Sequence, residues 1–451
     1  MLRLKGTSAA VTLLLILFIT IFFISQVALQ KNVEIPIVPQ GGDLVVIGGT
    51  TAAFIAALEG AGAGAQVFLF PNGEELLGDT AFLVSGGLAA SSTPPQFEQE
   101  IVFTAEDLET ALREAGQGVA DPLLLEAFTA EADLLYDLAL YYGGVDFSDI
   151  PDALKRPYLH FASQAAAGQI FGEQLLEKAE KTGIIFRPEK VREIHFTQGE
   201  NTDRIELIIL ENDKKETFCF YTQGVILADG GYSGNVYHHH RYLPQGNLIS
   251  LRPGQKGRGL DLAIGLDADF LQTDYLGKKM LLYNPLQGNY KELHPKNLQD
   301  TLFFNSRGQV LPGTHSLEEI ADFILGSPKD RVFILAPEET ARQNKAFFQE
   351  SATLEELANL YGLGEDSPFP LQNTYYVSVV KIGVDYTPGG LSVTPLGEVK
   401  KGDGQIILGL YAAGEISGGL HGEGMLPGMA LSETLFLAGQ AGRSAADYVR
   451  R

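Results

Sequence analysis

Residues 43–66 read DLVVIGGTTAAFIAALEGAGAGAQ, and the rest of the chain is organised around this stretch. Its apolar run, residues 44–47, predicts a strand that is buried on both faces. A Gly-Gly-Thr-Thr turn and a small-residue helix over residues 52–60 follow, and residues 67–70 (VFLF) predict a second parallel strand. Strand, glycine turn and helix in this order are typical of the opening of a dinucleotide-binding βαβ unit.

The turn departs from the G-x-G-x-x-G pattern of such units at one position. Aligned on that pattern, the chain has Gly48, Thr50 and Ala53. The second glycine normally lets the backbone approach a pyrophosphate, so the threonine stands where a departure matters most. The turn alone is therefore a weak signal, and the rest of the chain has to support it.

Composition and charge narrow the class of protein. At 451 residues the chain is long enough for two domains or for one large α/β unit with an insertion. Its formal net charge of -23 argues against nucleic acid as a partner, because phosphate groups would be repelled. Cys219 is the only cysteine, which excludes an intrachain disulfide, a cysteine-based zinc site and an iron–sulfur cluster, and its apolar neighbours predict a buried, inert thiol. The histidine triplet at residues 238–240 is interpreted as an exposed loop, so no metal site is predicted.

The N-terminal segment predicts a membrane anchor. Residues 9–29 carry no charge over 21 residues, which is enough for a helix to cross a bilayer core of about 30 Å. Arg3 and Lys5 precede this run and favour a cytoplasmic N-terminus, which places the catalytic part outside the cytoplasm. We expect a single-pass anchor over residues 1–30 and a tether over residues 31–42. The alternative is a signal peptide whose cleavage releases a secreted protein.

Further along the chain, hydrophobic periodicity predicts alternating helices and strands. Helices are expected over residues 104–142 and 169–181, and antiparallel strands over residues 186–194, 205–210 and 216–222. A second buried strand and small-residue turn follow at residues 224–235, then a glycine-started helix at residues 257–268. Residues 269–372 change to a mixed polar and aromatic texture, with a charged helix near residues 354–360. Strands return over residues 376–390 and 404–414, and the chain ends in a helix over residues 429–449.

Four stretches, in this order, resemble the fumarate reductase/succinate dehydrogenase flavoprotein family. They are the opening turn, ILADGGYSGN at residues 226–235, YTPGG at residues 386–390, and the C-terminal pair GQIILGLYAAGEISGGLHGEG and GMALSETLFLAGQAGRSAA at residues 404–424 and 428–446. The resemblance covers about residues 43–449. It implies an α/β fold, preceded by the transmembrane helix. A Rossmann-type FAD-binding domain, residues 43–238 and 373–451, would hold an inserted α+β capping (substrate) domain, residues 239–372.

The resemblance also implies where FAD binds. The cofactor-binding residues that it predicts are Gly48, Gly49, Thr50 and Thr51 at the pyrophosphate, Ser85, Gly86 and Gly87 along the isoalloxazine, Ala228, Gly230 and Gly231 on the adenosine side, Gly414 and Glu415 at the ribitol or pyrophosphate, and Ala430 and Leu431 at the pyrimidine edge of the ring. The alternative for each glycine is a plain tight turn.

Two departures from the family concern the cofactor. The second strand should end in an acid that binds ribose hydroxyls, whereas Pro71 and Asn72 follow it here. Either Glu74 or Glu75 substitutes for that acid, or both are solvated loop acids. No histidine precedes the Ser-Gly-Gly segment, where residues 79–81 read DTA, so FAD is expected to be bound non-covalently.

Other departures concern the substrate. Fumarate reducers of the family clamp substrate carboxylates with Arg and His, but Met425 stands at the Arg position and Tyr386 at the His position. The proton-donating Arg of the capping domain has no convincing match, although Arg307 and Arg331 are nearby candidates. A good fumarate or succinate site is therefore not expected. Tyr386 is the candidate catalytic residue, for moving a proton. Its alternative is an aromatic side chain packed under the glycines that follow, and His421 is expected to be structural.

Together these features predict a membrane-anchored, extracytoplasmic FAD-dependent oxidoreductase that acts on a C–C bond of a small-molecule substrate. A separate electron donor or a quinone is expected as partner, because the sequence contains no CxxCH haem-attachment motif. One alternative is a degenerate homologue that serves as a binding or assembly module without redox turnover, which Thr50, Pro71 and Met425 favour. Another is a non-dicarboxylate reductase that receives electrons from a separate membrane partner.

Overall fold

The computed structural model describes most of the chain from residue 40 to residue 451. Its gaps are residues 199–202, 236, 239–247, 285–286, 294–297, 299–300, 306, 308, 314, 328–331, 343 and 349–375. The predicted anchor, nearly all of the tether, the charged helix near residues 354–360 and Arg331 lie outside the described residues. No helix in the described part of the chain combines the length and the hydrophobicity needed to cross a bilayer.

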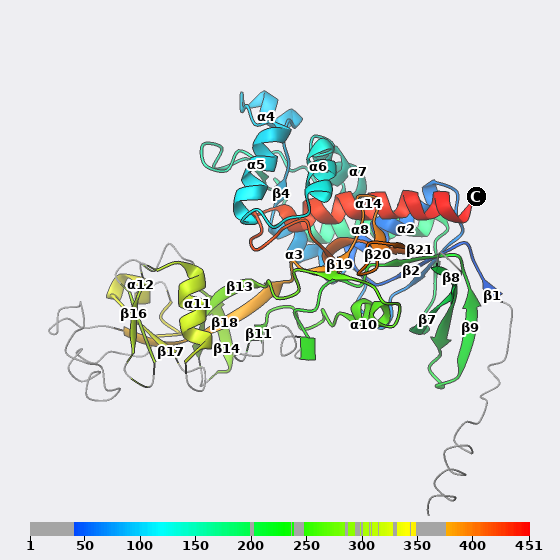
Figure 1. Ribbon diagram of the computed structural model, residues 1–451. Helices are drawn as coiled ribbons and strands as arrows, with labels where there is room; N and C mark the ends of the chain where they lie inside the picture. Colours follow the sequence, from blue (N-terminus) through cyan, green and yellow to red (C-terminus); the bar gives the residue numbers. More distant parts are fainter. Residues whose placement is uncertain are drawn as a thin grey trace, which may run out of the picture.

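The predicted βαβ opening lies at the centre of the larger, ten-stranded sheet (Figure 1). β2 (Leu44–Ile47) and β3 (Val67–Phe70) are parallel neighbours joined by helix α2 (Thr51–Gly62), and every residue of both strands is buried. The strand order across the sheet is β1 (Gln40–Gly41), β9 (Thr217–Tyr221), β8 (Asp203–Glu211), β21 (Ile406–Ala412), β10 (Gly224–Leu227), β2, β3 and β6 (Ile185–Phe186), with β20 (Glu398–Lys400) on β21 and β7 (Lys190–Gln198) on β8. The Rossmann-type expectation is confirmed.

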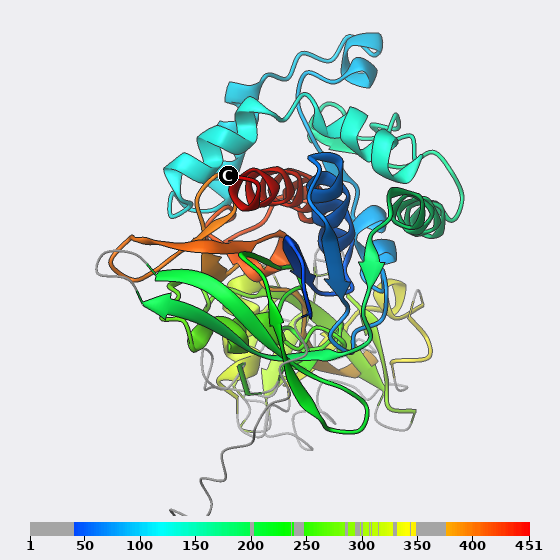
Figure 2. The ribbon, with the colours of Figure 1, turned by 90° about the vertical axis from the view of Figure 1, so that its right-hand side faces the viewer.

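Three helices cover one face of this sheet. The C-terminal helix α14 (Met429–Val449) lies beside α2, and α8 (Ala167–Thr182) follows next to α2 (Figure 2). Helices α14 and α2 approach closely at Gly442. A Cβ there would lie only 2.5 Å from the carbonyl oxygen of Ala56, so a glycine is needed at this position. Small residues in both helices therefore allow α14, far away in sequence, to complete the opening unit.

The helical pattern over residues 104–142 is divided into three helices. They are α5 (Ala105–Ala115), α6 (Pro122–Ala130) and α7 (Leu135–Gly143), preceded by α4 (Pro94–Glu98). Gly116 ends the first of them, and Asp121 starts the second by accepting hydrogen bonds from the N–H groups of Leu123 and Leu124. The helix-ending glycine and the Asp-Pro helix start therefore interrupt the helix, although the apolar periodicity continues across them.

A second sheet has its own apolar core and lies at the far left in Figure 1. Its order is β14 (Asn289–Glu292), β13 (Gly277–Asn284), β18 (Tyr376–Tyr386), β17 (Val332–Ala336), β15 (Leu302–Asn305) and β16 (Val310–Pro312), with β11 (Ile249–Ser250) on β18 and helices α11 (Leu317–Leu325) and α12 (Glu338–Arg342) beside it. All of these strands except β18 fall in the predicted capping range, residues 239–372. β18 continues from this sheet towards the larger one, so its C-terminal end lies at the junction.

The remaining short elements connect these layers. They are α3 (Thr80–Ser85), β4 (Leu88–Ala89), β5 (Leu159–His160), α10 (Arg258–Ile264), β12 (Phe270–Leu271), β19 (Gly390–Ser392), a 3-10 turn η3 (Gly414–Ile416) and β22 (Ser417–Gly418).

Two side chains differ from expectation. Cys219 is partly exposed rather than buried. His238 is fully buried rather than exposed, with its ring 5.7 Å from that of Tyr232 and Nε2 3.2 Å from Oδ1 of Asp261.

Candidate cofactor and active site

The C-terminal ends of three adjacent parallel strands meet at one edge of the larger sheet. β2 leads into Gly48, β10 into Ala228 and β21 towards Gly414. Gly48 has a φ of +137°, and a Cβ there would lie 2.1 Å from the carbonyl oxygen of Ala228, so only glycine fits. Open α/β sheets bind ligands at this edge, and three of the five predicted cofactor segments lie here.

Thr50 is used inside the protein. Its hydroxyl donates to the carbonyl of Ala228 at 2.6 Å and accepts from the N–H of Ala53 at 3.2 Å. The side chain therefore caps α2 and fastens it to the end of β10. This explains how a threonine replaces the second glycine of the pattern without disrupting the turn.

Two carboxylates occupy N–H groups at the start of α2. Glu74 Oε2 accepts from the N–H of Gly49 at 3.2 Å, and Asp79 Oδ1 accepts from the N–H of Thr51 at 2.9 Å. Glu75 is exposed, whereas Glu74 is half-buried, so the interpretation of both as solvated loop acids is wrong for Glu74. Burial raises the pKa of Glu74 to about 9, and burial also raises the pKa of Asp79.

These contacts test whether the edge fits FAD. The two N–H groups already donate to carboxylate oxygens, which stand in for the phosphate oxygens of a dinucleotide. Gly48 and Gly49 carry no side chain that would cover the turn, and α2 directs its N-terminus at it. Residues 48–51 therefore offer N–H donors and open space that suit a pyrophosphate, and Glu74 and Asp79 occupy those donors in this structure.

A buried ion pair lies next to the adenosine-side turn. Glu415 forms a salt bridge with Arg252 and accepts the N–H of Thr387 at 2.9 Å. A Cβ at Gly231 would lie 2.4 Å from Glu415 Oε1, so the turn that follows β10 and the turn that follows β21 are in contact. Burial raises the pKa of Glu415, and the nearby guanidinium partly opposes this rise. Arg252 was missed, because an isolated Arg in an irregular segment has no local signature.

The same guanidinium links this group to the Ser-Gly-Gly segment. Its central carbon lies 4.3 Å from the ring centroid of Phe82, on α3. Ser85 and Gly86, at the end of α3, are exposed, and Ser85 lines a cavity of about 510 Å³ together with Phe161. Gly87 is buried with a φ of +85°. This segment is thus accessible from the surface.

The start of α14 packs against the strand that follows Ser-Gly-Gly. Ala430 and Leu431 are buried in the first turn of the helix. The next residue, Ser432, accepts the N–H of Ala89 at 2.9 Å and donates to its carbonyl at 2.7 Å. Through this contact the fifth predicted segment lies beside the second.

A buried group of three polar side chains lies at the junction with β18. The hydroxyl of Tyr386 donates to Glu433 Oε2, and Nε2 of His421 lies 3.0 Å from the same oxygen. All three side chains are about 1% exposed or less. Burial raises the pKa of Tyr386 well above its ordinary value, so the phenol keeps its proton. Glu433 was missed, although an acid among the small and apolar residues of the final helix is an unusual choice.

Of the residues considered for the substrate site, Met425 is apolar and Arg307 lies in the second sheet. Met425 is half-buried and packs against the main core with Leu426. Arg307, one of the two candidate proton donors, is exposed on the turn after β15, within the second sheet.

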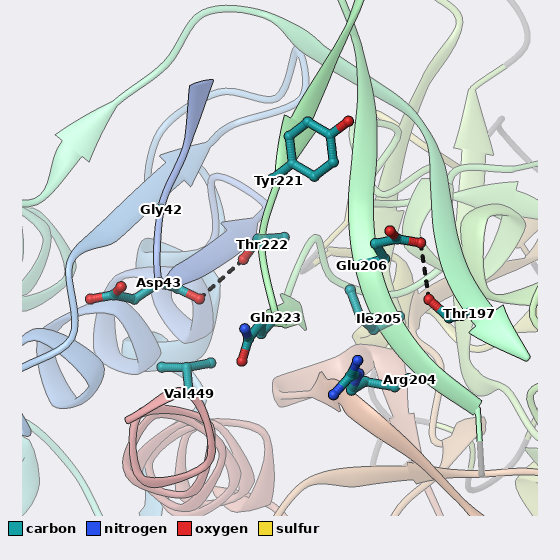
Figure 3. A pocket seen from close by; sticks show the side chains of 10 residues that line it. All are labelled: Gly42, Asp43, Thr197, Arg204, Ile205, Glu206, Tyr221, Thr222, Gln223 and Val449. Atoms are coloured by element: carbon teal, nitrogen blue, oxygen red, sulfur yellow. Dashed lines mark hydrogen bonds between the residues drawn. The ribbon is translucent and has the colours of Figure 1, made fainter. Parts of the chain in front are cut away.

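Another cavity, of about 340 Å³, opens at the opposite edge of the larger sheet (Figure 3). It is lined by residues before β2 and around β8 and β9, with the Thr222 hydroxyl donating to the Asp43 carbonyl at 3.1 Å and Thr197 donating to Glu206 at 2.9 Å. It faces the N-terminal ends of the parallel strands, away from the convergent glycine turns.

Comparison with known proteins matches a family described as FAD binding domain over residues 43–282 and 317–431. A fumarate reductase (cytochrome) of Shewanella frigidimarina is 24% identical over 453 residues, covering 91% of this chain and 78% of that protein. A vinyl phenol reductase of Lactiplantibacillus plantarum is 24% identical over 489 residues, covering 91% of this chain and 97% of that protein.

A solved structure, the open conformation of a flavocytochrome c3 fumarate reductase, has the same fold. It superposes with a TM-score of 0.77 at 20% identity, covering 94% of this chain and 81% of that one.

The Arg252–Glu415 pair predicts a specific pattern of stability. We expect Arg252→Met to lower the free energy of unfolding by about 3–5 kcal/mol, because a buried carboxylate loses its partner. The double variant Arg252→Met/Glu415→Gln should recover at least half of that loss. Denaturant unfolding measures both.

Arg192→Met is the matched control, since Arg192 and Glu211 form an exposed pair between neighbouring strands. It should cost far less than Arg252→Met. Equal losses for the single and the double variant would show that the two buried groups are not energetically coupled.

Proposed function

The chain belongs to the FAD binding domain family and is a divergent fumarate reductase-like flavoprotein, and from this premise we propose that it reduces a C=C bond of a small, weakly charged substrate outside the cytoplasm. FAD is its cofactor, and it is an oxidoreductase acting on CH–CH groups. The observation that carries the proposal is the buried hydrogen-bonded group of Tyr386, Glu433 and His421.

Tyr386 supplies the proton in this proposal. Bound FAD in its reduced form supplies a hydride to one carbon of the double bond, so the neighbouring carbon needs a proton. Tyr386 is protonated at physiological pH and stands at the position where the family has its substrate-binding His. Glu433 fixes the hydroxyl, and His421 contacts the same carboxylate oxygen of Glu433, so the three side chains form a path along which the phenol can be reprotonated.

The end of that path is a free ring nitrogen. Among the described residues, Nδ1 of His421 is buried and has no hydrogen-bond partner. A buried unpartnered nitrogen is costly, and a bound substrate or water molecule would satisfy it. His421 therefore has a role in the proton path beyond the structural one expected for it.

Met425 supports an apolar substrate. A thioether cannot hold a carboxylate as the bidentate guanidinium of the family does. The similar vinyl phenol reductase carries a name that refers to an uncharged aromatic alkene. We therefore infer an aryl alkene or an unsaturated ketone as the substrate class.

Location and electron supply belong to the same proposal. The uncharged run at residues 9–29 behind Arg3 and Lys5 supports an anchor that leaves the catalytic part outside the cytoplasm. Electrons would then come from a separate membrane donor or from a quinone. FAD would be held without a covalent bond, as the absence of a histidine at residues 79–81 supports.

A second candidate function is a module that keeps the fold without redox turnover. Glu74 and Asp79, which occupy the pyrophosphate donors, favour it. An absorbance spectrum of the purified protein after reconstitution with FAD separates the two candidates. Flavin bands near one equivalent support the reductase, and a colourless protein supports the module.

The substrate class gives a first prediction. With a chemical reductant as electron donor, kcat/KM for an uncharged aryl alkene or enone should exceed that for fumarate by at least about 100-fold, a difference of roughly 2.7 kcal/mol. Met425→Arg should narrow this ratio by improving fumarate, while Leu426→Met should leave it unchanged. Efficient fumarate reduction by the unaltered protein would contradict the proposal.

The proton path gives a second prediction. Tyr386→Phe should lower kcat by about 10²–10⁴-fold with the flavin spectrum intact, because only the proton donor is lost. Tyr411→Phe is the control, since Tyr411 is also buried but its hydroxyl contacts the Ser444 carbonyl on α14. Unchanged turnover in Tyr386→Phe would assign the side chain to packing.

The anchor gives a third prediction. The full chain should remain in the membrane fraction after alkaline carbonate extraction, and protease added to intact spheroplasts should degrade its C-terminal part. Arg3→Glu/Lys5→Glu should reduce the fraction that is accessible to protease. A soluble protein without residues 1–30 would establish the cleaved signal instead.

A further inference from the structure

Two side chains hold the donors that a cofactor needs. Asp79 accepts from both the N–H and the hydroxyl of Thr51, at 2.9 and 3.0 Å, and Glu74 accepts from the N–H of Gly49 at 3.2 Å. These N–H groups lie at the positive end of α2, where the negative pyrophosphate of FAD would bind. The carboxylates and the pyrophosphate therefore compete for the same hydrogen bonds.

Counted together with Glu74 and Asp79, acids outnumber bases at this point. Asp229 at the end of β10 and Arg258 at the start of α10 act on Glu74, and Arg252 acts on Asp79. The next charged groups are Asp261 near Asp229, Glu415 paired with Arg252, and Lys190 beside Gly73. Arg258 is itself bound to the Asn72 carbonyl at 2.5 Å. A pyrophosphate with two negative charges would meet uncompensated carboxylates here.

The structure shows that these acids are poorly supported as anions. Oε1 of Glu74 and Oδ1 of Asp229 are buried and have no hydrogen-bond partner among the described residues. A carboxylate that lacks donors in a buried site prefers its neutral form. Uptake of a proton is therefore an available way to remove the repulsion.

We propose that FAD enters this site by exchange, its pyrophosphate replacing the carboxylates of Glu74 and Asp79 on the N–H groups of Gly49 and Thr51, with uptake of protons by the acids at this edge. This inference rests on FAD as the cofactor and is independent of the substrate proposed above. It makes Glu74 and Asp79 residues that set the affinity for the cofactor and its dependence on pH.

The direction of the pH effect follows from linkage. Without FAD, burial raises the pKa of Glu74 to about 9 and that of Asp229 to about 7, and repulsion between acids adds to the effect for Glu74. A bound pyrophosphate raises both pKa values further, so the complex holds more protons than the free protein. Affinity is then greatest below about pH 7 and falls above it as Asp229 ionises in the free protein; Glu74 adds to the fall only above about pH 9, up to tenfold per pH unit for each proton taken up.

Titration of the full-length apoprotein with FAD tests the exchange. Flavin fluorescence and calorimetry in buffers of different ionisation enthalpy give the dissociation constant and the number of protons taken up. From pH 6.5 to 9 we expect the dissociation constant to rise at least tenfold, with net proton uptake. Riboflavin, which has no pyrophosphate, should show neither effect.

Glu74→Gln and Asp79→Asn remove the charge and keep an acceptor oxygen for the same N–H group. At pH 10, where Glu74 is largely ionised in the free protein, Glu74→Gln should bind FAD about tenfold more tightly than the unaltered protein. Asp79→Asn should also bind FAD more tightly, and together the two variants should weaken the pH dependence. Asp107→Asn is the matched control, because Asp107 accepts the N–H of Thr104 at 2.8 Å in an exposed helix cap far from the site. It should leave both quantities unchanged.

Three results would overturn the exchange: an affinity for FAD that does not change with pH, binding without proton uptake, or folded variants that bind no more tightly than the control. The measurements on the unaltered protein decide the matter even where a variant fails to fold. Since no substrate is present, a failure here is separate from a failure of the Tyr386 chemistry. FAD binding by exchange followed by no turnover would overturn only the proposed function.

Discussion

The close approach between Gly48 and the carbonyl of Ala228 is the constraint on which the rest of the site depends. It allows the ends of β2 and β10 to come together without a side chain between them, and Thr50 then fastens α2 to the same carbonyl. Because β21 is the next parallel strand, Gly414 and Glu415 are brought to the same edge. The C-terminal helix α14 packs on α2 in this arrangement.

Much of the fold was predictable because its signals are local. The buried strands Leu44–Ile47 and Val67–Phe70 are short apolar runs between polar turns, and the final helix, Met429–Val449, has a glycine before it. The helical region was predicted as one stretch because apolar periodicity continues across its breaks. Gly116 and the Asp-Pro start of α6 mark only the break between α5 and α6, and α7 begins without a side-chain cap.

The backbone turns of the candidate site could be predicted from the sequence, but the contacts of its charged side chains could not. Glycine turns recur in recognisable stretches, so the sequence indicates the turns that meet at the edge of the larger sheet; that these residues bind FAD stays a prediction. Arg252 and Glu433 were missed because each contacts a residue that is distant in sequence, Glu415 and Tyr386 respectively. Nothing near either residue in the sequence indicates these contacts. His238 was wrongly expected at the surface for a related reason, since its burial depends on packing against Tyr232.

The course of β18 has a mechanical consequence. The strand is hydrogen-bonded to β13 and β17 within the second sheet, and its last residue, Tyr386, is bonded to Glu433 on the helix that covers the first. A strand is stiff along its length, so any change in the angle between the two sheets is delivered to the phenol as a displacement. In the proposed mechanism, a movement of the second sheet and proton transfer from Tyr386 would therefore involve the same strand.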